Sequence, residues 1–359
     1  MMASDTPKLP GRLPSSSHEV IVLLEEVHMV LEGIDTTPRT HEYISYQRIN
    51  RAEEVRERIQ CASIVIAPQA FISAESLGDA PHLKCVITPT AGTNHIDVEE
   101  CRRRGIKVAK CLGSTSLAVP EHALSLYFAA RRKTIMLHDE IRTVDENGKN
   151  SWKRQGSIAS NMQTANGHPP YSLEQEVAGI FGYGTIGKRL DVFCKALGMK
   201  VLIAERKANG LSRKNLNEMK GPADFRTPFD EVIRSATVLF ICCTLDETSR
   251  NMIDAPELST MQPEAIIVNV SRAGVMNTTA VIRALRESQI SGVAVDVFDR
   301  EPASTEEDSA LLADDTAGLN LTLSPHVAYY STKTVLTMKA MVKEHIKNFV
   351  SGNYINFEV

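Results

Sequence analysis

Short apolar runs alternate with helical segments along the first third of the chain. The runs are rich in β-branched residues and are bounded by Pro, Gly or polar clusters, which is typical of strands. Helical segments lie between them, at residues 50–60 and 95–105. Strand–helix alternation indicates an α/β fold with a parallel sheet covered on both faces. The predicted strands are residues 20–24, 42–46, 63–68, 83–89 and 106–110.

A second alternating block begins at residue 177. Because it repeats the pattern of the first block, it predicts a second α/β domain. An acidic loop is expected at residues 304–318, and a final helix at about 331–350 follows the block. The predicted strands are 177–182, 200–205, 237–243, 265–270, 292–298 and 319–325, and the predicted helices between them are 185–197, 228–235 and 277–288.

The segment between the two blocks has a long 3.6-residue period at 119–142. Pro120 fits the first turn of that helix, where its missing N–H does no harm. The helix is too long and apolar for a plain surface position, so we expect an arm that joins two domains or packs against a partner subunit. Residues 143–175 show no period and predict mostly loop, in which Trp152 is expected to pack against other groups.

Length, composition and charge narrow the class of protein. With 359 residues, of which 43% are apolar, the chain is long enough for roughly two domains with separate cores. A net charge of −4 argues against non-specific nucleic-acid binding, and the basic stretch 101–105 is typical of a solvated helix end. The seven scattered cysteines contain no CxxC or Cys/His spacing for zinc, which favours reduced thiols in the cytoplasm.

Targeting segments leave recognisable patterns, and the sequence lacks the main ones. The sequence contains no run of about 18 apolar residues, so we expect no membrane span. Residues 1–18 are polar, rich in Pro and Ser, and contain no apolar core of a secretory signal. We expect a flexible tail there. An organelle transit peptide is the alternative, although the stretch has few basic residues.

The sequence VAGIFGYGTIGKRL places a G-x-G-x-x-G pattern after a predicted strand and at the start of a predicted helix. Gly182 permits a tight turn, Gly184 lets a pyrophosphate approach the backbone, and Gly187 lets the helix pack close to the strand. The N–H groups of Thr185 and Ile186 would then face the phosphates from a helix N-terminus. The alternative is a tight strand–helix turn without a ligand.

The end of the following predicted strand strengthens the dinucleotide interpretation. Glu205 lies about 20 residues further on, where a carboxylate accepts from the ribose hydroxyls and repels a 2′-phosphate. This favours NAD(H) over NADP(H), although Arg206 and Lys207 follow directly and would soften that preference. Thr244, after the predicted strand 237–243, is assigned to the same cofactor site.

Polar residues also occur at the ends of later strands: Arg272, Asp296, Glu301 and His326. Ligands bind beyond the carboxyl ends of strands in an open parallel sheet, so these four residues could line one crevice. His326 can move a proton at a carbinol oxygen, and Glu301 can orient its imidazole and stabilise the protonated form. Arg272 can hold a substrate carboxylate and polarise the adjacent carbonyl. Asp296 can accept from the nicotinamide carboxamide.

Each of these residues has a structural alternative. Arg272 can be a surface residue, and Asp296 a hydrogen-bonded core carboxylate. Glu301 can begin a turn before Pro302, and His326 can cap the last helix. Their combination behind a nucleotide motif favours a hydride-transferring enzyme.

At this level of detail the chain resembles the D-isomer-specific 2-hydroxyacid dehydrogenases, from about residue 60 to 350. LKCVITPTAGTNHID and RGIKVAKCLGSTSLAVPEHALSL are similar to the family's first-domain signatures. VAGIFGYGTIGKRL, NMIDAPELSTMQPEAIIVNVSRAG, GVAVDVFDREP and SPHVAYYS are similar to its later ones, in order and spacing.

The resemblance implies two Rossmann-like domains, a flavodoxin-like substrate domain and an NAD-binding Rossmann domain inserted into it. The implied substrate domain comprises residues 1–118 and 325–359, and the cofactor domain residues 119–324. The resemblance also implies a homodimer joined through the cofactor domain and its arm helix. It assigns Arg272, Glu301 and His326 to catalysis, and it places the substrate carboxylate, together with Arg272, on N–H groups near Ala91 and Gly92.

Two positions depart from the family pattern. Ala273 stands after the Arg where the family usually has Gly, which would cost roughly 1 kcal/mol if that position needed a positive φ. Pro120 replaces a usual Ala, which the first helical turn tolerates.

The substrate implied by the resemblance is a small 2-keto acid, with glycerate/hydroxypyruvate and glyoxylate reductases as the most similar branch. Pyruvate-like or phenylglyoxylate-like specificity is an alternative. Formate dehydrogenases pair the His with Gln, whereas Glu301 forms a titratable pair, and phosphoglycerate dehydrogenases usually carry a further regulatory domain that is not expected here. A rival from another class is an NAD-regulated corepressor of the same fold. We expect no nucleic-acid or membrane partner.

Overall fold

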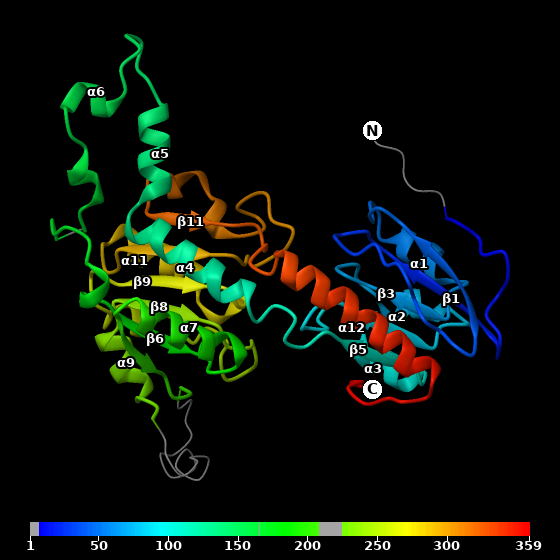
Figure 1. The fold of residues 1–359 in the computed structure, drawn as a ribbon. Coiled ribbons are helices and arrows are strands. Elements are labelled where there is room, and N and C mark those ends of the chain that lie inside the picture. Colours follow the sequence, from blue (N-terminus) through cyan, green and yellow to red (C-terminus); the bar gives the residue numbers. More distant parts are fainter. Residues whose placement is uncertain (1–6, 165, 208–224) are drawn as a thin grey trace. The chain divides into compact units, whose positions relative to one another are not determined.

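The computed structural model describes residues 7–164, 166–207 and 225–359, which form two compact units (Figure 1). Unit 1 contains the chain up to Thr115 and from Tyr330 to Val359, and unit 2 contains Ser116–Tyr329. The predicted division fell after residues 118 and 324. The chain therefore enters unit 2 and returns to unit 1, and the roles of substrate and cofactor domain remain predictions.

Unit 1 is a parallel sheet with the strand order β2-β1-β3-β4-β5, which is the flavodoxin-like order. Alternate side chains of the first strand, such as Val20 and Val22, pack in a core with residues of the N-terminal helices. The long C-terminal helix packs against β4. The elements are β1 (His18–Leu23), β2 (Thr40–Ser45), α1 (Glu53–Ile59), β3 (Ile64–Ile66), α2 (Ala74–Gly78), β4 (Cys85–Thr88), α3 (Val98–Arg103), β5 (Lys107–Lys110) and α12 (Thr332–Val350).

Unit 2 is a second parallel sheet, with the strand order β11-β10-β9-β8-β6-β7. Its strands are β6 (Val177–Phe181), β7 (Lys200–Ile203), β8 (Val238–Ile241), β9 (Ile266–Asn269), β10 (Gly292–Val295) and β11 (Leu321–Leu323). Its helices are α4 (Ala118–Arg131), α5 (Thr134–Arg142), α6 (Ser151–Gln155), α7 (Thr185–Ala196), α9 (Phe229–Ser235), α10 (Ala255–Leu258) and α11 (Thr278–Arg286). Each predicted strand overlaps an observed one, so the α/β fold with two Rossmann-like domains is confirmed.

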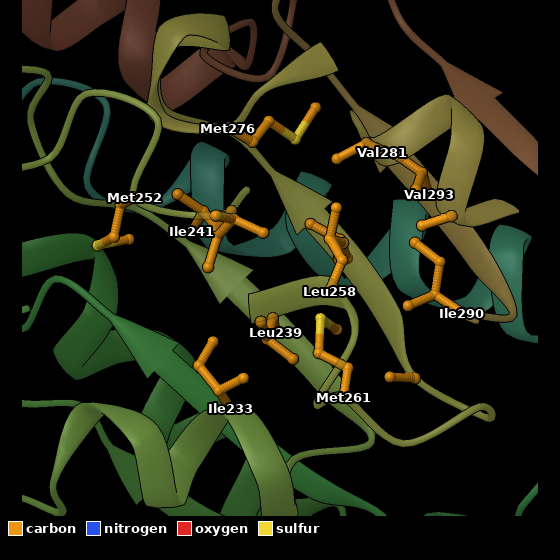
Figure 2. Close-up of a cluster of buried hydrophobic side chains, with 14 of the residues drawn as sticks. Ile233, Leu239, Ile241, Met252, Leu258, Met261, Met276, Val281, Ile290 and Val293 are labelled. Atoms are coloured by element: carbon orange, nitrogen blue, oxygen red, sulfur yellow. The ribbon is translucent and has the colours of Figure 1, made fainter. Parts of the chain in front are cut away.

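Helices cover both faces of the unit 2 sheet because successive strand residues point to opposite faces. Val238 and Phe240 lie in the core with α4 and α7, whereas Leu239 and Ile241 lie in the core with α9, α10 and α11. Figure 2 shows the second of these cores, in which strand side chains meet Ile233, Leu258 and other helical side chains. The fully apolar strands predicted from the sequence are thus buried on both sides.

The predicted helix at 119–142 is two helices. Lys133 has a left-handed backbone with φ 47°, which separates α4 from α5. Buried residues lie along α4 but none lies on α5, which extends away from the sheet of unit 2 together with α6 (Figure 1). Trp152 is 58% exposed within the single chain, so what it packs against stays a prediction.

Other details also refine the predictions. The strand expected at 237–243 ends at Ile241, and Cys242 and Cys243 follow it as half-buried residues of irregular chain. Short 3-10 turns interrupt several expected loops, at Ala159–Met162, Leu173–Gln175, Ala273–Val275, Ala310–Leu312 and Asp314–Thr316. All seven cysteines are free thiols. Within the described ranges, no helix combines the length and apolar character needed to cross a bilayer.

The terminal and basic segments are held locally. Residues 1–6 of the expected tail lie outside the described residues, but Lys8 Nζ donates to the Ser45 carbonyl at 2.7 Å and Gly11 N–H donates to Glu42 at 2.8 Å. Arg102 and Arg103 pair with glutamates on their own helix α3. This agrees with a solvated helix end.

A buried ion pair ties α4 to the start of β6. Arg131 is 4% exposed and Glu176 is 0% exposed. The Arg131 guanidinium donates to Glu176 Oε2 at 3.0 Å and to the Thr237 carbonyl at 3.0 Å, and Tyr127 donates to Glu176 Oε1 at 2.9 Å. A buried carboxylate without a partner is costly. The arrangement therefore holds α4 against the amino ends of β6 and β8.

Replacing Arg131 by Met should destabilise the protein by about 3–5 kcal/mol, since Glu176 would stay buried without its cation. Urea unfolding followed by circular dichroism measures this. Arg132→Met, at the exposed neighbouring position, is the control and should stay within about 0.5 kcal/mol of the wild type. A loss under about 1 kcal/mol for the Arg131 variant would show that the pair is dispensable.

Candidate active site

The carboxyl ends of all strands of unit 2 lie at one edge, because the sheet is parallel throughout. From β6 the chain moves to β7 on one side, and then to β8 on the other side of β6. The order reverses between β6 and β8, and open α/β sheets bind ligands at the carboxyl ends of strands where such a reversal occurs. The sequence-predicted residues of unit 2 all follow strands at this edge.

The glycine turn after β6 has the geometry that the pattern predicted. Gly182 has φ +98°, and a Cβ there would lie 2.6 Å from the backbone nitrogen of Cys243. A Cβ on Gly187 would lie 2.0 Å from the carbonyl oxygen of Gly182. The first glycine therefore serves the tight turn beside β8, and the last serves the close approach of α7 to that turn.

Gly184 differs from its two neighbours, because no described protein atom lies within 4 Å of the Cβ that it lacks. Its φ of −84° is open to any residue. It is the N-cap of α7, and no side chain of the described residues caps that helix end. Thr185 and Ile186 begin the helix. The space and the uncapped N–H groups fit the pyrophosphate of a dinucleotide, which supplies the acceptors that the protein does not.

The residues predicted to contact the adenosine half occupy the ends of β7 and β8. Glu205 is half-buried after β7, and Arg206 is exposed. Lys207 is engaged elsewhere: its Nζ lies 2.7 Å from Glu257 and donates to the Met252 carbonyl at 3.1 Å. Thr244 is exposed after β8. Of the two cations after Glu205, Arg206 is therefore the exposed one.

His326 and Glu301 form a pair at the carboxyl end of β11. His326 Nδ1 lies 2.5 Å from Glu301 Oε2, and Glu301 Oε1 accepts from Phe298 N–H at 2.9 Å. Burial raises the pKa of Glu301, but His326, the Phe298 N–H and the charge of Arg272 lower it more, so the net pKa lies below its usual value. An ionised Glu301 therefore faces one ring nitrogen of His326, whose side chain is 40% exposed.

Arg272 follows β9 on a turn that a buried side chain builds. Asn269, 0% exposed, donates from Nδ2 to the Arg272 carbonyl at 3.0 Å and accepts at Oδ1 from the Ser271 N–H at 3.0 Å. Arg272 is extended, with φ −145°, and Ala273 after it has no positive φ. The departure from Gly at Ala273 therefore brings no left-handed strain.

Asp296 is 1% exposed after β10, and its carboxylate is surrounded by donors. Oδ1 accepts from Ser324 Oγ at 2.6 Å and from Val327 N–H at 3.0 Å, and Oδ2 accepts from Ala328 N–H at 2.8 Å. Burial raises its pKa, but His122, Ser324 and the two N–H groups lower it more. Asp296 is thus a hydrogen-bonded core carboxylate, and its contact with a nicotinamide amide remains a prediction.

Three polar residues near these groups were not selected from the sequence: His122, Asn269 and Ser324. His122 Nε2 lies 2.9 Å from Ser324 Oγ. Asn269 and Ser324 interrupt or border apolar runs, as Asp296 does, so the same signal would have found Asn269 in IIVNVS and Ser324 before His326. His122 lay inside a helical period and carried no such signal.

Ala91 and Gly92, two of the predicted carboxylate-binding residues, belong to unit 1, in the loop after β4. The Thr88 and Thr90 hydroxyls are 2.8 Å apart, and Thr90 Oγ1 donates to the Gly92 carbonyl at 2.6 Å. Across the described part of the chain, no recorded hydrogen bond uses the N–H of Ala91 or Gly92. Such N–H groups suit an anion.

Comparison with known proteins gives one family. The family model described as D-isomer specific 2-hydroxyacid dehydrogenase, NAD binding domain, matches residues 127–328. A glyoxylate reductase of Pyrococcus furiosus is 31% identical over 281 residues, covering 78% of this chain and 77% of that protein. A glycerate dehydrogenase of Methylorubrum extorquens is 28% identical over 325 residues, covering 89% of this chain and 94% of that protein.

Solved structures agree on the fold. An acyclic imino acid reductase in complex with NADPH and D-Arg has a TM-score of 0.73 and 19% identity, covering 95% of this chain and 100% of that one. At this identity the likeness concerns the fold alone.

An alanine substitution should have different effects at the middle glycine, Gly184, and at the last glycine, Gly187. Gly184→Ala should leave the thermal midpoint within about 2 °C of the wild type but weaken NADH binding about tenfold, since its Cβ meets a ligand and no protein atom. Gly187→Ala should cost about 1–3 kcal/mol of stability, because its Cβ overlaps Gly182. Thermal melts and NADH titration by fluorescence measure both. Normal NADH affinity in Gly184→Ala would contradict pyrophosphate binding at this turn.

Proposed function

Since the chain belongs to the D-isomer specific 2-hydroxyacid dehydrogenase family and carries its NAD-binding domain, we propose that it reduces small 2-keto acids to D-2-hydroxy acids. Glyoxylate and hydroxypyruvate are the proposed substrates. The observation that carries the proposal is the His326–Glu301 pair, 2.5 Å apart at the same strand edge as the glycine turn. A proton donor beside a hydride donor is what carbonyl reduction requires.

The residues divide the chemistry between them. The Gly182–Gly187 turn would hold the dinucleotide, which would supply a hydride to the carbonyl carbon. Because Nδ1 of His326 faces Glu301, Nε2 is the nitrogen that donates a proton to the carbonyl oxygen. Glu301, ionised, stabilises the protonated ring before the transfer and keeps its orientation. The product is the hydroxy acid, and the ring is reprotonated from water.

Two groups are proposed to hold the substrate carboxylate. Arg272 lies near enough to Glu301 to lower its pKa, so its guanidinium charge acts in the same region as His326. A fork of N–H donors binds a carboxylate and polarises the adjacent carbonyl. The family resemblance assigns the N–H groups of Ala91 and Gly92, in unit 1, to the same carboxylate.

The partner of His326 favours a 2-keto acid over formate. Formate oxidation releases CO2 and transfers no proton to an oxygen, so it has no use for an acid–base pair. Glu301 keeps such a pair. The relatives named glyoxylate reductase and glycerate dehydrogenase support the short-chain substrates.

A panel of 2-keto acids tests the proposed function. NADH oxidation should be fastest with hydroxypyruvate or glyoxylate, and slower with pyruvate and phenylglyoxylate. His326→Ala should lower kcat more than a hundredfold while NADH affinity changes little, because the proton donor is lost and the cofactor turn is intact. Tight NADH binding without turnover of any 2-keto acid would instead favour an NAD-regulated binding protein.

The cofactor preference is proposed to rest on Glu205 against Arg206. A carboxylate at the end of β7 accepts from ribose hydroxyls and repels a 2′-phosphate. Lys207 is bound to Glu257 and the Met252 carbonyl, so it does not offset this repulsion. Exposed Arg206 does so in part. We therefore propose NAD(H) as the preferred cofactor, with NADP(H) accepted less well.

Removing the side chains of the neighbouring residues Glu205 and Arg206 should shift the cofactor preference in opposite directions. Glu205→Ala should raise the ratio of kcat/KM with NADPH to that with NADH about tenfold, since the repulsion of the 2′-phosphate is removed. Arg206→Ala, the matched change, should lower that ratio. Initial rates with both cofactors measure it. An unaltered ratio in Glu205→Ala would show that this carboxylate does not face the ribose.

A cytoplasmic homodimer through the α5–α6 arm is also proposed. The arm carries exposed apolar side chains, namely Ile135 (43%), Ile141 (41%), Val144 (56%) and Trp152 (58%). Apolar residues gathered on a projecting segment are typical of a protein interface. A second copy of the chain is the partner that the family resemblance implies.

Light scattering coupled to size exclusion should give twice the chain mass for the wild type. The double variant Ile141→Asp with Trp152→Glu should give the mass of one chain, because charges would be buried at the interface. Val30→Asp, at a 45% exposed apolar position of unit 1, is the control and should remain dimeric. A dimer in the arm variant would place the interface elsewhere.

A further inference from the structure

His326 sits on a short loop whose backbone is in an unusual conformation. Its φ is +52°, a left-handed value that a residue with a Cβ rarely adopts. Such a conformation persists when surrounding contacts hold it. His326 N–H donates to the Ser324 carbonyl at 3.0 Å, and the next two N–H groups donate to Asp296. The orientation of the imidazole therefore depends on Asp296.

Asp296 is in turn connected to α4 through Ser324 and His122. Ser324 Oγ lies 2.6 Å from Asp296 Oδ1, and His122 Nε2 lies 2.9 Å from Ser324 Oγ and 3.5 Å from Asp296 Oδ1. The His122 side chain is 24% exposed. This connection joins residues about 200 positions apart in the sequence, within unit 2.

The direction of these hydrogen bonds follows from the chemistry of the groups. The pKa of Asp296 lies below its usual value, so its carboxylate is an acceptor. A serine hydroxyl has one proton, which Ser324 must donate to Asp296. Ser324 Oγ then accepts from His122, which must carry its proton on Nε2. The assignment works for the neutral ring and for the charged ring alike, because both can donate from that nitrogen.

We infer that His122 is a positioning residue: through Ser324 and Asp296 it holds the loop that carries His326. Without the His122 donor, Ser324 loses one hydrogen-bond partner. Asp296 then loses part of the hydrogen bonding that offsets the cost of burying its charge. The N–H groups of Val327 and Ala328 are then held less firmly, and His326 spends less time in its catalytic orientation. This inference rests on the proposed function for its kinetic consequence, but not for the contacts themselves.

Hydrogen exchange provides the direct test, because it requires no turnover. In His122→Leu, the backbone amides of Val327 and Ala328 should exchange about tenfold faster than in the wild type at the same pH. His122→Gln places an amide donor near the position of Nε2 and should exchange like the wild type. His168→Leu makes the same change at a 66% exposed histidine of unit 2 and is the control, with wild-type exchange expected.

Kinetics provide the second readout. In His122→Leu, kcat with hydroxypyruvate should fall about tenfold while the KM for NADH stays within about twofold, and His122→Gln should recover most of kcat. Adding Ser324→Ala to His122→Leu should cost less than the sum of the single changes, because both act through one connection.

Two results would overturn the inference: unchanged exchange at Val327 and Ala328 in His122→Leu, or equal acceleration in the Leu and Gln variants. The second would mean that ring packing matters and the hydrogen bond does not. A wild-type enzyme that reduces no 2-keto acid would overturn the proposed function alone, since the exchange experiment still decides the role of His122.

Discussion

The carboxylate of Asp296 is 1% exposed, yet its pKa lies below the usual value, so the group is ionised in the protein. An ion in that position is tolerated where donors surround it. The donors come from the loop after β11 and, through Ser324, from α4. Hydrogen bonds to this one buried charge thus hold the backbone that follows His326.

The cofactor side of the site depends on a steric constraint of the opposite kind. Here atoms must be missing: a Cβ on Gly182 or Gly187 would overlap backbone atoms that lie 2.6 and 2.0 Å away. The close approach brings the uncapped N-terminus of α7 to the carboxyl end of β6, beside β8. The polar network around Asp296 and the close-packed glycine turn therefore both lie at the carboxyl ends of the unit 2 strands.

Much of this could be predicted from local pattern. Apolar runs gave the strand positions to within a few residues, and Gly182 and Gly187 have the geometry expected of them. Local pattern failed where the deciding contact was distant. The period at 119–142 continues through Lys133, but α4 ends where Arg131 is buried against Glu176 and α5 buries nothing. Trp152 was expected to pack against other groups, but its side chain is 58% exposed within the single chain, and composition cannot tell which surface covers it.

The sequence by itself determined the α/β architecture, the glycine turn and the identity of the pair His326 and Glu301, because periodicity and residue chemistry are local properties. The tertiary structure decided that Asp296 is saturated with donors, that Lys207 is bound to Glu257, and that His122 reaches Ser324. These contacts join residues tens to hundreds of positions apart. The direction and partner of a polar side chain are chosen by burial and by the donors around it, and no spacing along a chain encodes them.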